Sequence, residues 1–299
     1  MITIDHVSKS FGFIKALDNV SFTIRNGEIV GYVGLNGAGK TTTMKIAVGV
    51  LTPDSGDVFI DNYSITRNKR IASKYVGWVP EQPIFEMDMK ALDYFTYLAG
   101  YYGLSISEAR SIGRKLLEEV GLGNALNRKL KEYSLGMKRR FALAVSMINN
   151  PPNFLFDEAM SGLDPKGIAF FRELVVKLKK NNCAILFSSH ILSEVENIAD
   201  RVVFIHRGRI VADMTIDEIR SRAKPVLRIR IEPVNDELIN ILKSYGEPRV
   251  EKEYVYISRF TGDSNELLSY LIKNNYRVLE YGFSRLLEEV FFELIGEKK

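Results

Sequence analysis

The nine-residue run GLNGAGKTT, residues 34–42, constrains the fold of this chain more than any other feature, because it fits the pattern G-x-x-x-x-G-K-[ST]. It follows EIVGYV, an apolar run typical of a buried strand, and precedes TTMKIAVGV, whose pattern indicates a helix. In this setting a glycine-rich turn points successive backbone N–H groups and the positive end of the helix at phosphate groups. We therefore predict a phosphate-binding loop in an α/β protein.

The residue types of this loop suit a nucleotide with its metal ion. Gly34, Gly37 and Gly39 allow the backbone to close around an anion without Cβ clashes. Lys40 is expected to reach the β- and γ-phosphates, and the Thr41 hydroxyl is expected to ligate Mg²⁺. The nucleotide-binding residues predicted in the loop are Gly34, Asn36, Gly37, Ala38, Gly39, Lys40, Thr41 and Thr42.

Two later strand ends carry candidate catalytic groups. The run FLFDE, residues 154–158, ends a buried strand with two carboxylates, of which Asp157 would hold Mg²⁺ and Glu158 would polarise the attacking water. Taken alone, such a pair is usually a solvated strand end or a helix cap, but the loop upstream favours the catalytic interpretation. The run LFSSH places His190 at the end of another apolar strand, where it could donate a hydrogen bond to a γ-phosphate. A histidine in such a turn is more often a satisfied surface group.

Short apolar runs alternate with helical patterns through most of the chain, which predicts an α/β fold with a largely parallel central sheet. The strands are expected at ITIDHV, VSFTI, EIVGYV, DVFI, VGWVP, NFLFD, CAILFSS and RVVFIH. At Lys224–Pro225 the pattern changes to the strictly alternating run LRIRIE, after which further helix and strand patterns alternate. We predict a first domain over residues 1–220, with a helical subdomain at about 84–150, and a small α/β domain over residues 224–299.

Composition bounds the partners and the compartment. The 41 basic and 37 acidic residues are spread along the chain and give a net charge of +4, so we expect a mixed, solvated surface and no nucleic-acid partner. The single cysteine, Cys183, lies in the apolar run CAILF, which favours a buried thiol and excludes an intrachain disulfide. No stretch approaches the ~20 apolar residues of a membrane helix, and MITIDHVSKS lacks the features of a signal peptide. We expect a soluble, cytoplasmic protein.

The motifs of the first 220 or so residues together resemble those of the nucleotide-binding subunit of an ATP-binding cassette (ABC) transporter. In that family's order the chain carries GLNGAGKTT as Walker A, YSLGM at the signature position, FLFDE as Walker B, SGLD as the D-loop and SSH as the switch histidine. The resemblance implies a P-loop NTPase of ABC ATPase type that binds ATP and Mg²⁺, with Asp164 of the D-loop as a further ATP-binding residue. It also implies that two such subunits, identical or different, pair head to tail. Each ATP would then lie between one subunit's Walker motifs and the other's signature turn.

The signature turn departs from the family pattern LSGGQ. Ser134 and Gly136 match the two positions whose hydroxyl and backbone N–H contact the γ-phosphate, aided by the N-terminus of the following helix. Leu135 replaces the first Gly, and Met137 replaces the Gln. Because a side chain at position 135 restricts the backbone, we hypothesise a working signature that closes more weakly. Ser134 acting only as a helix N-cap is compatible with this role, since both use the same exposed N–H groups.

A second departure lies in VGWVPEQP. The family has Gln directly after the Pro, where its side chain contacts Mg²⁺ and the nucleophilic water, whereas this chain has Glu81 followed by Gln82. A carboxylate can ligate Mg²⁺, although it adds negative charge beside a triphosphate. The predicted metal ligands are therefore Thr41, Asp157 and either Glu81 or Gln82.

Two aromatic stretches carry further expectations from the resemblance. Phe11, in SKSFGFIKAL, matches the aromatic residue that stacks on adenine, with Phe13 as a nearby alternative. The segment 84–104 is rich in Met, Phe and Tyr, which is typical of a helical core. We expect a mixture of core and apolar groove there, because the membrane subunit's coupling helix docks beside this region in the family.

The last helix, SRLLEEVFFELIG, resembles the closing segment of cassettes that serve ABC-2-type exporters, whose pore is a separate permease chain. Its apolar residues at helical spacing indicate a packed face made by Leu286, Leu287, Val290, Phe291, Leu294 and Ile295. We predict an ATP-hydrolysing subunit that powers export through a permease at the inner face of the cell membrane. A regulatory subunit pairing with a different cassette and a soluble non-transport ABC ATPase are the alternatives. The transported molecule, the direction of transport and the identity of the permease are not encoded in this chain.

Overall fold

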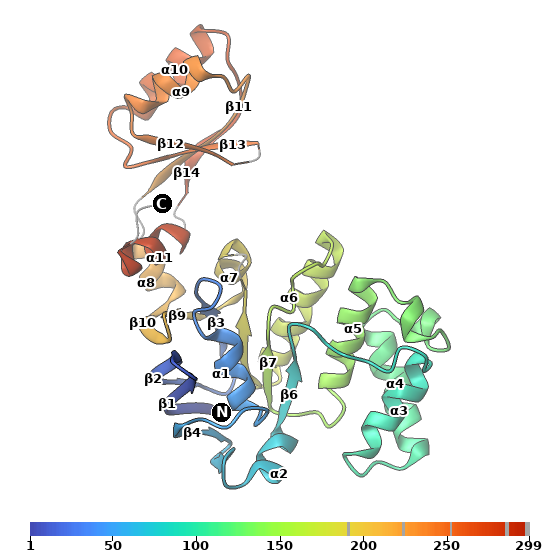
Figure 1. Cartoon of the computed structure of the whole chain (residues 1–299). Helices are drawn as coiled ribbons and strands as arrows, with labels where there is room; N and C mark the ends of the chain where they lie inside the picture. Colours follow the sequence, from blue (N-terminus) through green and yellow to red (C-terminus); the bar gives the residue numbers. More distant parts are fainter. Residues whose placement is uncertain (190–191, 223–224, 252, 285–286, 297–299) are drawn as a thin grey trace. The chain divides into compact units, whose positions relative to one another are not determined.

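The chain divides into two compact units, Met1–Thr215 and Ile216–Lys299 (Figure 1). The structure, a computed structural model, describes residues 1–189, 192–222, 225–251, 253–284 and 287–296. The predicted boundary was at residues 220–224, whereas the contacts assign helix α8 (Ile216–Arg222) to the second unit. Helix α8 contacts α11 (Leu287–Ile295), which belongs to the same unit.

The core of the first unit is a six-stranded sheet in the order β10-β9-β3-β8-β7-β6. The bounds are β3 Ile29–Val33, β6 Val76–Val79, β7 Asn153–Phe156, β8 Ala184–Ser188, β9 Arg201–His206 and β10 Arg209–Thr215. Neighbouring strands are parallel except for the β9–β10 hairpin. Every residue of β3, β7 and β8 is buried, as expected for parallel strands covered on both faces. The predicted parallel central sheet is confirmed.

Three of the predicted strands form a separate antiparallel sheet instead of joining the parallel one. Its order is β2-β1-β4-β5, with β1 Ile2–Phe11, β2 Ile14–Ile24, β4 Ser55–Ile60 and β5 Tyr63–Ser64. Strands β1 and β2 are joined only by Gly12 and Phe13, and so short a connection can link only antiparallel strands. The apolar faces of both sheets share one core around helix α1 (Lys40–Ala47), to which Ile4, Met44 and Leu186 belong.

The helices of the first unit flank the parallel sheet and form a helical subdomain. Their bounds are α2 Lys69–Ala72, α3 Ala91–Gly100, α4 Ile106–Glu119, α5 Leu135–Ser146, α6 Pro165–Lys180 and α7 Leu192–Ile198, with 3₁₀ turns at Ser73–Tyr75, Gly123–Ala125 and Leu130–Glu132. Figure 1 shows α3, α4 and α5 grouped together beside β6. Helix α4 begins with a capping box between Ser105 and Glu108. A Cβ at Gly113 would lie 2.7 Å from Phe95, so a residue without a side chain allows α3 and α4 to pack closely.

The second unit contains a four-stranded antiparallel sheet in the order β12-β13-β11-β14. Its elements are β11 Val226–Glu232, α9 Asp236–Lys243, β12 Glu247–Glu251, β13 Tyr254–Ser258, α10 Ser264–Lys273 and β14 Arg277–Ser284, with α8 and α11 at its ends. Leu227, Ile229 and Ile231 are buried against α9 and α10, as the alternation in LRIRIE predicted. In α11, Leu287, Val290 and Phe291 are buried, and Leu286 of the predicted face lies outside the described residues.

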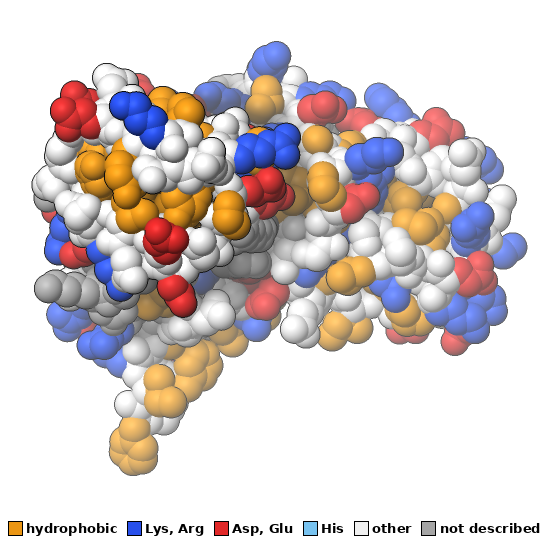
Figure 2. Space-filling view, turned by 90° about the horizontal axis from the view of Figure 1, so that it is seen from above, with side chains coloured by type: hydrophobic (Ala, Val, Ile, Leu, Met, Phe, Trp, Pro, Cys, Tyr) orange, Lys and Arg blue, Asp and Glu red, His pale blue; other side chains and the backbone are white. Residues whose placement is uncertain are grey.

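The surface is mixed in charge, and none of the helices in the described ranges is long and apolar enough to cross a membrane. Figure 2 shows basic and acidic side chains interspersed with apolar ones on the face that it presents. This agrees with the even spread of charge along the sequence. The lone Cys183 is buried, as predicted.

Candidate nucleotide-binding site

The phosphate-binding loop connects the buried strand β3 to α1, as predicted. The Lys40 ammonium donates hydrogen bonds to the Gly34 carbonyl at 2.7 Å and the Leu35 carbonyl at 3.2 Å, so this side chain folds back over the loop. Helix α1 begins after Gly39, which has no side chain to cap the N–H groups of the first turn. Those N–H groups and the positive helix end are therefore available to an anion beside Lys40.

The glycines of the loop are required for two different reasons. A Cβ at Gly34 would lie 2.3 Å from the Ile205 carbonyl oxygen, and one at Gly39 would lie 2.8 Å from the Ala16 carbonyl oxygen. Gly37 has open space around it, but its φ of +79° favours glycine. At Gly34 and Gly39 the absent side chain thus makes room for the protein's own backbone.

Asp157 lies at the centre of a small polar cluster in front of the loop. Its Oδ1 accepts hydrogen bonds from Thr41 Oγ1 at 3.2 Å and from Ser188 Oγ at 2.8 Å. Its Oδ2 is buried and has no hydrogen-bond partner among the residues that the structure describes. Burial raises the pKa of this carboxyl, and the hydrogen bonds from Ser188 and Thr41 partly oppose that shift.

The donor set of this cluster fits a magnesium ion. A hydroxyl and a carboxylate with an unpartnered buried oxygen are hard oxygen ligands of the kind that Mg²⁺ prefers. Within the described ranges, no group of three or more His, Cys, Asp or Glu side chains is arranged to hold a metal ion. An ion held by Thr41 and Asp157 would therefore need phosphate oxygens and water to complete its shell.

Glu158 follows Asp157 in a left-handed conformation with φ of +49°. Such a backbone costs about 1–3 kcal/mol and persists only where the surroundings fix it. Here the Glu158 N–H donates to Ser188 Oγ at 2.9 Å, so Ser188 holds both acidic residues. Sequence analysis singled out only the histidine of the run SSH and missed this serine. His190 lies outside the described residues, and its catalytic role stays a prediction.

Two buried cations lie beside the acidic residues. Strands β6 and β7 run parallel with Val79 opposite Phe156. The acidic residues that follow these strands, Glu81 after β6 and Asp157 and Glu158 after β7, therefore leave the sheet at the same edge. Burial lowers the pKa of the Lys40 ammonium, while Glu158, Asp157 and Glu81 act in the opposite direction. Arg139 of α5 is also buried. Glu81 and Gln82 are both exposed.

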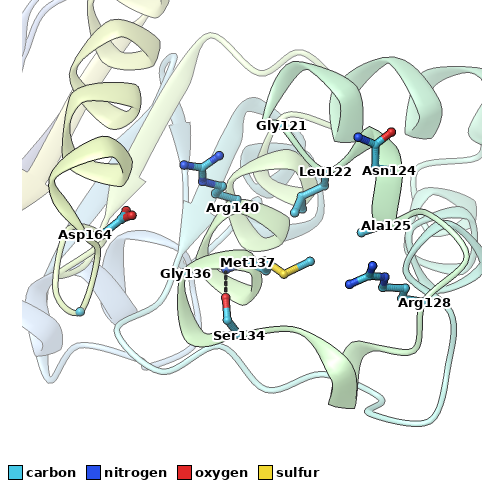
Figure 3. A pocket seen from close by; sticks show the side chains of 11 residues that line it. Gly121, Leu122, Asn124, Ala125, Arg128, Ser134, Gly136, Met137, Arg140 and Asp164 are labelled. Carbon is cyan, nitrogen blue, oxygen red and sulfur yellow. Dashed lines mark hydrogen bonds between the residues drawn. The ribbon is translucent and has the colours of Figure 1, made fainter.

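The signature turn forms the start of α5. Ser134 is the N-cap, and its Oγ accepts a hydrogen bond from the Met137 N–H at 3.2 Å (Figure 3). Leu135 is the first helical residue and, within the described part of the chain, is not among the residues with positive φ. Its side chain lies beside the D-loop, since a Cβ at Gly162 would come within 2.8 Å of Leu135 Cδ2. The leucine therefore fits this turn in an ordinary helical conformation.

A pocket of about 470 Å³ opens in front of this turn (Figure 3). Its lining combines the N-terminus of α5 with two arginines and comprises Gly121, Leu122, Asn124, Ala125, Arg128, Ser134, Gly136, Met137, Arg140, Gly162 and Asp164. Asp164 caps α6 by accepting a hydrogen bond from the Gly167 N–H at 2.8 Å. The predicted residues Ser134, Gly136 and Asp164 thus share this pocket, and none of the described residues of the phosphate-binding loop lines it.

The predicted adenine-stacking residues lie in the hairpin between β1 and β2. The exposed fraction of Phe11 is 48%, and its ring centroid lies 5.8 Å from Lys9 Nζ. Phe13 is fully exposed at the tip. The hairpin borders the loop, because Ala16 of β2 approaches Gly39. Either ring is available for stacking, and the role stays a prediction.

Comparisons with known proteins agree with this arrangement. The family model described as ABC transporter matches residues 17–161. The bacitracin transport ATP-binding protein BcrA of Bacillus licheniformis is 30% identical over 295 residues, covering 97% of this chain and 95% of that protein. The lantibiotic transport ATP-binding protein SrtF of Streptococcus pyogenes is 37% identical over 217 residues, covering 73% and 92%.

Solved structures give the same picture for most of the chain. One is described as the ATP-binding subunit of an ABC transporter; it has a TM-score of 0.69 and 31% identity and covers 74% of this chain and 92% of its own. A dimeric ATP-binding cassette in a post-hydrolysis state with ADP and Pi has a TM-score of 0.67 and 26% identity, covering 72% and 99%. The predicted P-loop fold of ABC ATPase type is confirmed.

Proposed function

This chain belongs to the ABC transporter family, as an ATP-binding subunit, and we propose a mechanism for it on that basis. It is an ATPase, and it powers a membrane permease. The direction that we propose is export, since relatives across most of its length are named for bacitracin and lantibiotic transport. The observation that carries the site assignment is the meeting of Thr41 and Asp157 in front of the phosphate-binding loop.

The loop and the acidic cluster would bind Mg²⁺ and ATP together. The N-terminus of α1 and Lys40 would attract the β- and γ-phosphates, and Thr41 and Asp157 would hold a magnesium ion beside them. The ion supplies charge neutralisation at the γ-phosphate. Phe11 or Phe13 stacks on adenine at the β1–β2 hairpin.

Glu158 would position water for attack on the γ-phosphate. Ser188 fixes its backbone in the left-handed conformation, directly after β7 and next to Asp157. His190 would donate a hydrogen bond to the γ-phosphate from the end of β8. Hydrolysis would depend on Glu158 more than on any other side chain of the site.

Two copies of the cassette would complete each site. The signature pocket is lined by Ser134, Gly136 and Asp164 but by none of the described loop residues, which supports a role for it on a second subunit's ATP. Arg128 and Arg140 beside the N-terminus of α5 favour an anionic ligand there. ATP would then close a head-to-tail pair, and hydrolysis would reopen it.

The permease would dock on the helical subdomain from the membrane side, with the cassette at the inner face of the cell membrane. Leu92 and Phe95 of α3 are buried in the core, whereas Ile84, Tyr97 and Tyr101 are exposed. This division supports the expected mixture of core and apolar docking surface.

Size-exclusion chromatography with light scattering tests this proposal. Because reopening would require hydrolysis, the Glu158→Gln variant should accumulate as a dimer in Mg²⁺ and ATP, and as a monomer in ADP. Adding Ser134→Ala should weaken that dimer, since Ser134 would contact the partner's nucleotide. A Glu158→Gln variant that binds ATP but stays monomeric at all concentrations would refute self-pairing.

A further inference from the structure

Arg139 of α5 is a charged residue that is buried and has therefore lost most of its hydration. It lies one turn after the signature residues, and only 7% of its surface is exposed. A buried guanidinium loses several kcal/mol of hydration unless charges or hydrogen bonds replace the water. The sequence motifs assign no role to this residue, so we infer its role from the groups that it contacts.

The contacts of Arg139 lead to the acidic side of the nucleotide site. Its Nη1 donates a hydrogen bond to the Pro80 carbonyl at 3.2 Å, directly before Glu81. Its Nε is buried and has no hydrogen-bond partner among the described residues. Pro80 directly follows β6, and Asp157 directly follows the neighbouring strand β7. The Asp157 N–H donates a hydrogen bond to the Val79 carbonyl at 2.9 Å. The guanidinium therefore lies at the sheet edge that carries the acidic residues.

Among the described residues, the acidic side chains at this edge outnumber the two buried cations beside them, Lys40 and Arg139. Three carboxylates, Glu81, Asp157 and Glu158, act on Arg139 and on Lys40 alike. Burial lowers the pKa of the Arg139 guanidinium, and Glu81 is the strongest of the groups that oppose that shift. In the proposed mechanism Lys40 is engaged by phosphates. Arg139 is then the cation left to offset the carboxylate at position 81.

We propose that Arg139 is the counter-charge of Glu81: it holds the segment after β6 through the Pro80 carbonyl and offsets the carboxylate that stands where cassettes of this family have glutamine. Arg139 is a positioning residue, because it acts on the nucleotide through Glu81. The inference rests on the proposed function, since it assumes that Mg²⁺ and ATP bind beside Asp157. The pairing would explain how the site tolerates the extra negative charge of Glu81 next to a triphosphate.

Four variants of the full chain test this coupling: Arg139→Gln, Glu81→Gln, the double variant and Arg139→Lys. Steady-state hydrolysis gives KM for Mg·ATP and kcat, and binding of a fluorescent ATP analogue with Mg²⁺ gives an affinity that is independent of turnover. Arg114→Gln is the matched control, because it removes one positive charge from an exposed site on α4. Thermal unfolding of each variant checks the fold.

Arg139→Gln should raise KM by about tenfold with a smaller change in kcat, because an unbalanced carboxylate repels the triphosphate. In the Glu81→Gln background the same change should alter KM by less than about threefold. Arg139→Lys should retain most of the affinity, since it retains the charge, and Arg114→Gln should match the parent.

Equal losses from Arg139→Gln in both backgrounds, or no rescue by lysine, would overturn the inference and indicate a packing role only. If Arg139→Gln does not fold, recovery of folding in the double variant supports the charge pair, and failure of both to fold refutes it. Absence of Mg·ATP binding by the parent chain would instead refute the proposed function, so the two failures are distinguishable.

Discussion

Replacing Asp157 by asparagine should make the free protein more stable and at the same time abolish its stabilisation by Mg²⁺ and ATP. Asp157 is fully buried, and its Oδ2 has no hydrogen-bond partner among the described residues. Asparagine has the same shape, and its oxygen can still accept the hydrogen bonds from Thr41 and Ser188. The change therefore removes a buried charge while leaving the packing intact, at the cost of a metal ligand.

The structure gives the size and the sign of the effect. An unpartnered buried polar atom costs about 1–3 kcal/mol and a charged one costs more, whereas the amide that replaces the carboxylate retains only the polar cost, so we expect a net gain of about 1–2 kcal/mol. For a unit of this size, that gain raises Tm by about 2–8 °C. Because burial raises the folded-state pKa of Asp157, its ionised form destabilises the fold above that pKa. The gain in the variant should be largest at neutral pH and should shrink as the pH falls toward the ordinary aspartate value.

Differential scanning calorimetry of the parent and the variant, with and without Mg²⁺ and ATP, measures both effects. The parent should gain stability from Mg·ATP beyond its gain from ATP alone, whereas the variant should gain equally from both. A lower Tm of the ligand-free variant would contradict the account of the orphaned oxygen. A Mg²⁺-dependent shift that survives the substitution would contradict the assignment of Asp157 as a metal ligand.

Three further predictions follow from glycine contacts and from the buried thiol. Gly34→Ala should destabilise the first unit by about 2 kcal/mol or more, because its Cβ would lie 2.3 Å from the Ile205 carbonyl oxygen. A Cβ at Gly136 would meet no atom within 4 Å, so Gly136→Ala should leave Tm within about 2 °C and reduce only ATP-dependent dimerisation. Gly162→Ala should lower stability more in the parent than in a Leu135→Gly background, because the new Cβ meets the Leu135 side chain only in the parent. In the Leu135→Gly background only the strain of alanine at the Gly162 φ of +74° remains. Equal losses measured by chemical denaturation would show that the two residues do not interact. Cys183 should react with a thiol reagent on the order of tenfold or more slowly in the native protein than in urea, since burial raises its pKa, and equal rates would exclude the buried position.

Local patterns were sufficient for the loop and for the buried strands. The run GLNGAGKTT predicted the turn between β3 and α1, and the apolar run before Asp157 predicted β7. The alternation in LRIRIE predicted which face of β11 is buried. Each of these features depends on neighbours in sequence, so the sequence alone was enough.

The features that were missed depend on distant residues or on weak patterns. Strand β12, EPRVE, lies at a sheet edge and contains a proline and three charged residues, so no apolar pattern marked it. Ser188 bonds to Asp157 across 31 positions, and Arg139 bonds to Pro80 across 59. No local rule connects such residues, because the packing of β6, β7, β8 and α5 brings them together.

The central claim is that this chain hydrolyses ATP at a site completed by a second cassette. The most direct test is steady-state hydrolysis of Mg·ATP at several protein concentrations, beside the Glu158→Gln variant. The account predicts activity that rises more steeply than linearly with concentration and that is lost in the variant. Activity strictly proportional to concentration from a monomer, or activity that survives in Glu158→Gln, would contradict it.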